Sequence, residues 1–388
     1  MKFRLTSILL LLLVIASPAC ASNPVLLSQG LEQRVDFWKK VYVKYGADDV
    51  IIHDRIYVNL IYAVTTKATQ NTKITEIQNA LREIRSNLET PNNLSPAAVP
   101  IFAAIVAQDL PLSSSLIDHL FANIHTQIGI KERFRDGVIR SGRYIEKFRE
   151  IMTEHDVPAE LALLPLVESS FQNAKSKAGA VGVWQFTSGT GKCYMKITSK
   201  VDERLDPVRS SEAAAHFLRD NYKMLGTWPL AITAYNHGRG GMLQAHKQHG
   251  SNLPAVISGY RGPVFGYASM NFYSEFLAAV EVYKNYPQYF GELTLDKPDS
   301  PPYKSPTMKA SNLRAKGTAA VVTTKYKVKN GDTLSDIAQR FGMPTRNLMD
   351  KNKLKKPVIY AGQILLVKQS VHRRRGDNTT STSRLNRL

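Results

Sequence analysis

Hydrophobic residues recur at helical spacing through the first half of the chain. One apolar stripe comprises Ile74, Ile77, Leu81, Ile84 and Leu88. A second comprises Phe134, Val138, Ile145, Phe148 and Met152. Such stripes form the buried face of amphipathic helices. Only YVNLIYAVTT, which is β-branched and aromatic, favours an extended chain. The pattern predicts a helical N-terminal region over residues 22–157.

From residue 158 the segments stay helical, but glycine-rich loops interrupt them. SKAGAVGVWQFTSGTGK and NHGRGG cannot be regular helix throughout. FYSEFLAAVEVYKNY is an amphipathic helix with Phe272, Phe276, Val280 and Tyr283 along one side. We expect this helix to close a second helical domain over residues 158–290. Proline, serine and lysine then dominate, so 291–324 is expected to be a linker.

A small separate unit is expected over residues 325–368. YKVKNGDTLSDIAQRFG begins as an alternating strand, and Thr333 with Asp336 can cap a helix. TRNLMDKN offers a second helix and QILLV a returning strand. The basic tail over 369–388 is expected to be disordered. The whole chain is therefore predicted to be mainly α, with a small βααβ domain.

Composition and charge fit a globular, multidomain protein with a polyanionic partner. The 388 residues suffice for two or three domains, and 43% of them are hydrophobic. The 51 basic against 32 acidic residues give a net charge of +19. Such a charge favours nucleic acid, an anionic membrane or an acidic wall polymer, without choosing among them.

The N-terminus narrows this choice. Lys2 and Arg4 precede an apolar run and the small residues of SPACAS, a pattern typical of an export signal over residues 1–21. The run is shorter than the about 20 apolar residues of a membrane span, and no later run approaches that length. We expect an exported, periplasmic protein with no nucleic-acid partner. Cleavage after Ala21 and lipidation of Cys20, which would anchor the chain to the outer membrane, both remain open.

The candidate chemistry centres on Glu168, the one charged residue of LLPLVESSFQ. Burial among apolar side chains raises the pKa of a carboxyl, and an acid protonated near neutral pH can donate to a leaving group. The alternative is a partly exposed glutamate at a helix end. No Asp or Glu occurs between Glu168 and Asp202, and the next acids lie in a polar stretch. A two-carboxylate glycosidase mechanism thus has no obvious second member, and a single-acid mechanism would need help from the substrate.

A metal site or cofactor is not expected. His237, His246 and His249 cluster, but they lack zinc-ligand spacing and a nearby cysteine pair. No glycine-rich phosphate loop follows a strand.

Three short stretches combine into a more specific pattern: VESSF at 167–171, GVWQF at 182–186 and TAYNHG at 233–238. Together they resemble the lytic transglycosylase family with a lysozyme-like SLT domain, over about residues 160–286. The resemblance implies that one glutamate cleaves the β-1,4 bond between N-acetylmuramic acid and N-acetylglucosamine in peptidoglycan. The sugar's own C6 hydroxyl then closes a 1,6-anhydro ring, so neither water nor a second carboxylate is required.

The resemblance also assigns the site residues. Glu168 is the acid and base, and the substrate-binding set is Ser169, Gln185, Tyr235, Asn236 and Tyr273. Tyr273 stands for a tyrosine that the family's last helix supplies, although MNFYSEF departs from the usual Thr-Arg-x-Tyr form. Trp184 is either a sugar platform or a core residue, with the core favoured.

Residues 325–368 resemble a LysM module, a family that binds N-acetylglucosamine chains between two loops. The resemblance implies one wall of Gly331, Asp332, Thr333 and Leu334, and another of Val358, Ile359 and Tyr360. Asp332 and Thr333 can instead serve only as helix caps.

Two rival functions stay open: a water-using muramidase, since goose-type lysozymes share the fold, and a non-catalytic peptidoglycan-binding protein. A monomer is expected. Neither endo or exo action nor the role of the N-terminal region follows from the residues.

Overall fold

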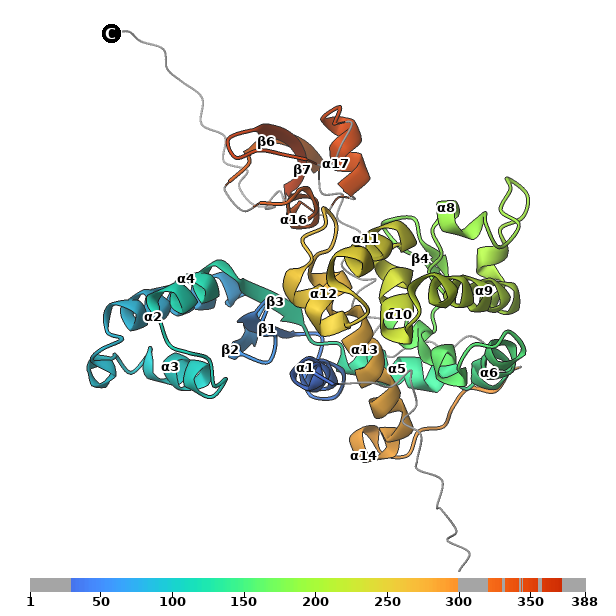
Figure 1. Ribbon diagram of the computed structural model, residues 1–388, viewed down its shortest axis with the longest axis horizontal. Helices are drawn as coiled ribbons and strands as arrows, with labels where there is room; N and C mark the ends of the chain where they lie inside the picture. The colour runs from blue at the N-terminus through green and yellow to red at the C-terminus, as the bar shows by residue number, and fades with distance from the viewer. Residues whose placement is uncertain are drawn as a thin grey trace, which may run out of the picture.

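The computed structural model describes residues 29–298, 320–329, 332–341, 343, 345–354 and 358–371. The expected export signal, Cys20, Gly331 and residues 372–388 lie outside the described residues. The described chain is mainly α-helical, as predicted (Figure 1). Among its described helices, none combines the length and apolarity needed to cross a bilayer.

One hydrophobic core extends across the boundary that we expected at residue 157. It joins α1 (Glu32–Val43), α5 (Lys131–Ser141) and α6 (Ile145–Glu154) to the helices that follow. α1 packs against α13 (Tyr267–Lys284), and α6 packs against α9 (Pro207–Leu225). The first and central parts of the chain therefore form one body, called the main body below, rather than two separate domains.

The segment between α1 and α5 forms a lobe with its own core, which projects from the main body (Figure 1). Its sheet has the antiparallel order β2-β1-β3. The strands are β1 (Asp49–Asp54), β2 (Ile61–Thr66) and β3 (Ile124–Ile128). The helical elements are α2 (Gln70–Ser86), η1 (Pro91–Asn93), α3 (Val99–Val106) and α4 (Ser114–Ala122).

The prediction of helix throughout this region was wrong for β1 and β3. Only β2 falls in the stretch that we expected to be extended. β1 buries five of its six residues, so it lacks the alternation of apolar and polar positions that marks a half-exposed strand. The helical stripe of α2 is confirmed, because Ile77, Leu81 and Ile84 are buried.

Short elements and loops dominate the chain around Glu168. They are η2 (Ala159–Leu163), α7 (Pro165–Glu168), β4 (Ala174–Lys175), β5 (Val181–Gly182), α8 (Ser188–Gly191) and η3 (Glu203–Leu205). Longer helices follow: α9, α10 (Trp228–His237), α11 (Arg239–His249), α12 (Leu253–Gly259), α13 and α14 (Tyr286–Phe290).

The ends of α9 show how local sequence sets these boundaries. Asp206 accepts hydrogen bonds from the backbone N–H groups of Val208 and Arg209, and Pro207 begins the helix. Gly226, with a φ of 73°, ends it in the left-handed conformation that glycine favours.

The C-terminal unit has the predicted βααβ order. It consists of β6 (Ala320–Lys327), α16 (Leu334–Arg340), α17 (Thr345–Lys351) and β7 (Ile364–Val371), with β6 and β7 antiparallel. Its core includes Leu334, Ile337 and Leu365.

Both ends of the expected 291–324 linker differ from the prediction. β6 begins inside that range, at Ala320. Leu293 and Leu295 pack against the core of the main body, and Asp296 pairs with Arg143 at 3.2 Å. These early residues therefore belong to the main body.

Candidate active site

Glu168 ends α7, a single helical turn that Pro165 begins. The chain then turns sharply, because Ser170 and Phe171 both adopt positive φ values, 53° and 56°. Such values are rare for residues with a side chain, so surrounding contacts must hold them. Arg140 Nε donates to the Ser170 carbonyl at 2.8 Å, and the Phe171 ring stacks against Phe148.

The carboxyl of Glu168 lies in a cavity of about 450 Å³. Glu168 is half-buried and follows a run of fully buried apolar residues. This burial raises the pKa of Glu168 from 4.5 to about 8. The other lining residues are Arg133, Ser169, Gln172, Ala174, Lys175, Ser176, Lys177 and Gln185. This cavity is called the groove below. Its lining is mostly polar and basic, and Glu168 contributes a neutral acid to it.

Strands β4 and β5 pair antiparallel and form a glycine-rich hairpin. Ser169 and Gln185 join α7 to this hairpin and to the residues that follow it. Ser169 is buried, and its hydroxyl donates to the carbonyl of Val183 at 2.6 Å. The amide nitrogen of Gln185 donates to the carbonyls of Gly182 at 2.7 Å and Ala174 at 3.1 Å. The predicted pair therefore lies beside Glu168, and its visible role is to fix the hairpin on which the groove depends.

Gly182 is a position that only glycine fits. Its φ is 88°, and a Cβ there would lie 1.8 Å from the backbone oxygen of Arg204. The Arg204 guanidinium in turn donates to the Phe186 carbonyl and pairs with Asp202 at 2.7 Å. Asp202, the first acid after Glu168 in the sequence, is therefore engaged in holding this loop.

Tyr235, on α10, lies close enough to Glu168 to respond to its charge. Burial, followed by the Glu168 charge, raises the Tyr235 pKa well above its usual range. The Tyr235 hydroxyl donates to the Trp184 carbonyl at 2.8 Å. Trp184 itself is fully buried and donates its Nε1–H to Ser211, so it is a core residue.

Asn236 lies one residue further along α10 and is exposed. Its Oδ1 accepts a hydrogen bond from the Ser269 hydroxyl at 2.9 Å. This bond ties the end of α10 to the start of α13.

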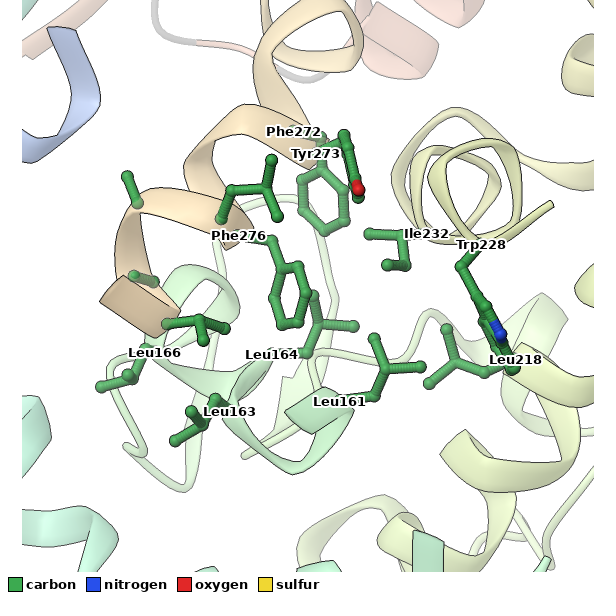
Figure 2. Close-up of a cluster of buried hydrophobic side chains, with 14 of the residues drawn as sticks. Leu161, Leu163, Leu164, Leu166, Leu218, Trp228, Ile232, Phe272, Tyr273 and Phe276 are labelled. Carbon is green, nitrogen blue, oxygen red and sulfur yellow. The ribbon is translucent and has the colours of Figure 1, made fainter. Parts of the chain in front are cut away.

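The structure does not place Tyr273 in the groove with Glu168. Tyr273 is 1% exposed and lies among buried side chains that include Ile232 (Figure 2). It lines a different cavity, of about 240 Å³, with Leu31, Trp228 and Leu253. The choice of Tyr273 from the motif was therefore wrong, because this face of α13 packs into the core.

Glu275, two residues further along α13, is an acid that the sequence analysis missed. Two residues correspond to about 200° around a helix, so Glu275 and Tyr273 point in nearly opposite directions. α13 packs against α7, and Glu275 lies close enough to Glu168 to respond to its charge. Burial and then that charge raise the pKa of Glu275 to about 8. The sequence analysis found no obvious second carboxyl because it considered only acids close to Glu168 in the sequence.

Comparison with known families places this groove within a described domain type. The transglycosylase SLT domain model matches residues 148–257, and the LysM domain model matches residues 326–368. The chain carries an SLT transglycosylase domain followed by a LysM domain. The SLT match begins in α6, which agrees with the continuous core across residue 157.

Relatives of the chain include cell-wall enzymes and a wall-binding protein. Membrane-bound lytic murein transglycosylase D of Escherichia coli is 26% identical over 326 residues, covering 68% of this chain and 72% of the relative. Membrane-bound lytic murein transglycosylase F 2 of Alkalilimnicola ehrlichii is 32% identical over 28% of this chain and 25% of its own. Cell wall-binding protein YocH of Bacillus subtilis is 52% identical over 12% of this chain and 16% of its own. The SLT domain and the transglycosylase relatives support a peptidoglycan-cleaving lyase.

The LysM domain exposes only part of the surface expected to bind glycan. Val358 and Tyr360 are 48% and 73% exposed, and Thr333 is also exposed. Leu334 is 3% exposed and Ile359 packs against the LysM core, so the expectation that Leu334 lines a groove was wrong.

Asp332 has a role besides the expected ones. Its Oδ2 accepts hydrogen bonds from the Tyr326 hydroxyl at 2.7 Å and from the Lys329 N–H at 2.8 Å. It therefore braces the loop between β6 and α16.

No metal centre emerges from the geometry. Among the described residues, no group of three or more His, Cys, Asp or Glu side chains could hold a metal ion. His237 instead contacts aromatic rings, those of Tyr260 and Phe265.

Proposed function

We propose that the chain is a peptidoglycan lytic transglycosylase in which Glu168 is both acid and base. The observation that carries this proposal is the half-buried carboxyl of Glu168, whose pKa burial raises to about 8. Such an acid keeps its proton near neutral pH and can give it to a glycosidic oxygen. The SLT domain and the relatives named above supply the substrate class.

The proposed reaction needs only one such acid. Glu168 protonates the oxygen between N-acetylmuramic acid and N-acetylglucosamine, and the bond from that oxygen to C1 breaks. The muramic acetamido group stabilises the positive charge at C1. The Glu168 carboxylate then takes the proton of the C6 hydroxyl, and that oxygen bonds to C1. A 1,6-anhydro end forms, Glu168 regains its proton, and no water is consumed.

The neighbouring residues would hold Glu168 and the sugar in fixed positions relative to each other. Ser169 fixes α7 to the hairpin, and Tyr235 supports the hairpin from below. The amide nitrogen of Gln185 is engaged by the hairpin, so its amide oxygen is the group that would accept a hydrogen bond from the sugar. Asn236 would contact the substrate from the end of α10.

Glu275 gives a specific reason to keep a water-using muramidase as the second candidate. Inverting glycosidases use a second carboxylate to activate water. The half-buried Glu275 lies near Glu168, so the site does not exclude this chemistry on residue type alone. A purely wall-binding protein has no comparable support, because it would not require a protonated acid in a groove.

We further propose that the LysM domain and the net charge of +19 hold the enzyme on peptidoglycan in the periplasm. Thr333, Val358 and Tyr360 are the exposed residues that would contact glycan. Lipidation of Cys20 would add an outer-membrane anchor, and cleavage after Ala21 would leave the enzyme free in the periplasm as a monomer.

Glu168→Gln tests the proposal. The variant keeps the shape of the side chain but cannot ionise, so cleavage of purified sacculi should fall by about 1,000-fold or more. Binding of the variant to sacculi, measured by co-sedimentation, should be unchanged. Cleavage near the wild-type rate would reject Glu168 as the acid.

The same variant has a signature in stability. Native Glu168 holds its proton up to about pH 8, whereas in the unfolded chain it ionises near pH 4.5. Its burial therefore costs stability progressively as the pH rises through that window. Glu168→Gln removes this cost, so we expect its Tm to exceed that of the wild type at pH 8 but not at pH 4.

A further inference from the structure

Helix α13 brings a second acid close to Glu168 from a distant part of the sequence. α13 packs against both α1 and α7, and most of its residues are buried. Glu275 is half-buried between Ser274 and Phe276, which are 1% and 0% exposed. Its place on the helix turns it away from the core-facing Tyr273 and toward the helix that ends in Glu168. The SLT match ends before this helix begins, so the match does not assign Glu275 a role.

Contacts from α1 fix the backbone at this point. The Tyr42 hydroxyl donates to the Glu275 carbonyl at 3.3 Å. Tyr42 is itself 1% exposed and stacks on Phe134 of α5, with ring centroids 4.4 Å apart. The segment before residue 158 thus sets where the second acid stands, which gives α1 a part in building the site.

The charged and titratable groups around the two acids leave the pair without a neutralising partner. Arg133 of α5 lines the groove with Glu168, but it donates to the Ser170 hydroxyl at 3.0 Å. Tyr42 of α1, Tyr235 of α10 and Tyr267 of α13 are neutral near pH 7, because burial raises the pKa of each. In the described part of the chain, no cation is among the groups that shift the pKa of either acid.

Three further charged residues do not shift the pKa of either acid. Lys175 and Lys177 line the groove but are exposed to solvent, and neither is among the groups that shift the Glu168 pKa. Glu281 of α13 pairs with Lys39 of α1 at 2.5 Å, and its side chain is 44% exposed.

We propose that Glu275 is a positioning residue that keeps Glu168 in its acid form, a role that rests on the proposed acid/base function of Glu168. Two carboxyls in one poorly solvated site resist ionising together, so the presence of each raises the pKa of the other. The pair is uncharged when the glycan binds. It carries one negative charge after Glu168 has given up its proton, at the moment when the sugar becomes positive. Glu275 keeps its own proton throughout and forms no bond to the substrate.

The test compares Glu275→Gln with Glu281→Gln, a matched change on the same helix that leaves the groove untouched. The Tyr42 contact is to the backbone, so neither variant removes it. The pKa of Glu168 is read from the ¹³C resonance of its side-chain carboxyl in glutamate-labelled protein, assigned by its loss in Glu168→Gln. We expect Glu275→Gln to lower the Glu168 pKa by about one unit. Glu281→Gln should leave it unchanged.

Activity gives the second readout. The basic limb of the pH profile for sacculus cleavage should move down by the same amount in Glu275→Gln, with the rate near the acidic optimum retained. Glu275→Ala should shift the limb in the same direction, which guards against an effect peculiar to the amide.

Two outcomes overturn the proposal. An unchanged Glu168 pKa in Glu275→Gln means that the two acids are not coupled. A loss of cleavage at every pH, as deep as that of Glu168→Gln, means that Glu275 acts on the reacting atoms and is not a positioning residue. Cleavage that survives Glu168→Gln would instead reject the proposed function, while the resonance shift would still report the coupling.

Discussion

The two neighbouring acids, Glu168 and Glu275, are placed by different features of the fold. Glu168 lies on α7, inside a short segment whose neighbours in sequence are also its neighbours in space. Glu275 lies on α13 and comes close to Glu168 only because α13 packs against α1 and α7. Local sequence sets the position of Glu168, whereas tertiary packing sets that of Glu275. A sequence motif can therefore reveal Glu168 but not Glu275.

The first way to sharpen this comparison is to remove a local contact next to Glu168. Ser169→Ala removes the hydroxyl that donates to the Val183 carbonyl at 2.6 Å and leaves that buried carbonyl without this donor. We expect a loss of about 1–3 kcal/mol in the free energy of unfolding. Glu168 would then no longer be held in a fixed position relative to the hairpin, so the rate of cleavage should fall about 10- to 100-fold.

The measurements are denaturant unfolding and the rate of sacculus cleavage. At the exposed start of α8, the Thr187 hydroxyl accepts a hydrogen bond from the backbone N–H of Thr190 at 3.3 Å. Thr187→Ala therefore serves as a control for a lost hydroxyl away from Glu168. An unchanged rate of cleavage in Ser169→Ala would show that the position of Glu168 does not depend on the Ser169 hydrogen bond.

A smaller effect separates the two tyrosines that the sequence treated alike. Tyr235→Phe removes the hydroxyl that donates to the Trp184 carbonyl close to Glu168, so cleavage should fall several-fold, by roughly 1 kcal/mol of activation free energy. Tyr273→Phe alters a side chain that faces another cavity and should leave the rate of cleavage within about two-fold of wild type. Initial rates on the same sacculi compare them, and a larger loss from Tyr273→Phe would contradict the orientation of α13.

Much of the fold followed from hydrophobic spacing, and the exceptions share a cause. The stripes on α2, α5 and α6 are buried as expected, and so is the helix face of the LysM domain. β1 escaped prediction because it is buried on both faces. The domain boundary at 157 was misplaced because α1, α5 and α6 complete the core of the SLT domain, which only tertiary contact reveals.

The candidate site divides in the same way. Glu168, Ser169, Gln185 and Tyr235 were predicted from motifs and lie together. Tyr273 was chosen by residue type, and the turn of the helix points it elsewhere. Glu275 did carry a signal, since it is the one charged residue of FYSEFLAAV, as Glu168 is of LLPLVESSFQ. That signal had no interpretation until packing placed the two acids together.

The chemical identity of the new chain ends tests the central claim most directly. Sacculi digested with the wild-type protein are reduced with borohydride, and the released muropeptides are weighed by mass spectrometry. If Glu168 works alone with the substrate's C6 hydroxyl, the new ends carry 1,6-anhydromuramic acid, which borohydride does not reduce. New ends that are reducible N-acetylmuramic acid would mean that water attacks C1, and the transglycosylase account would be wrong.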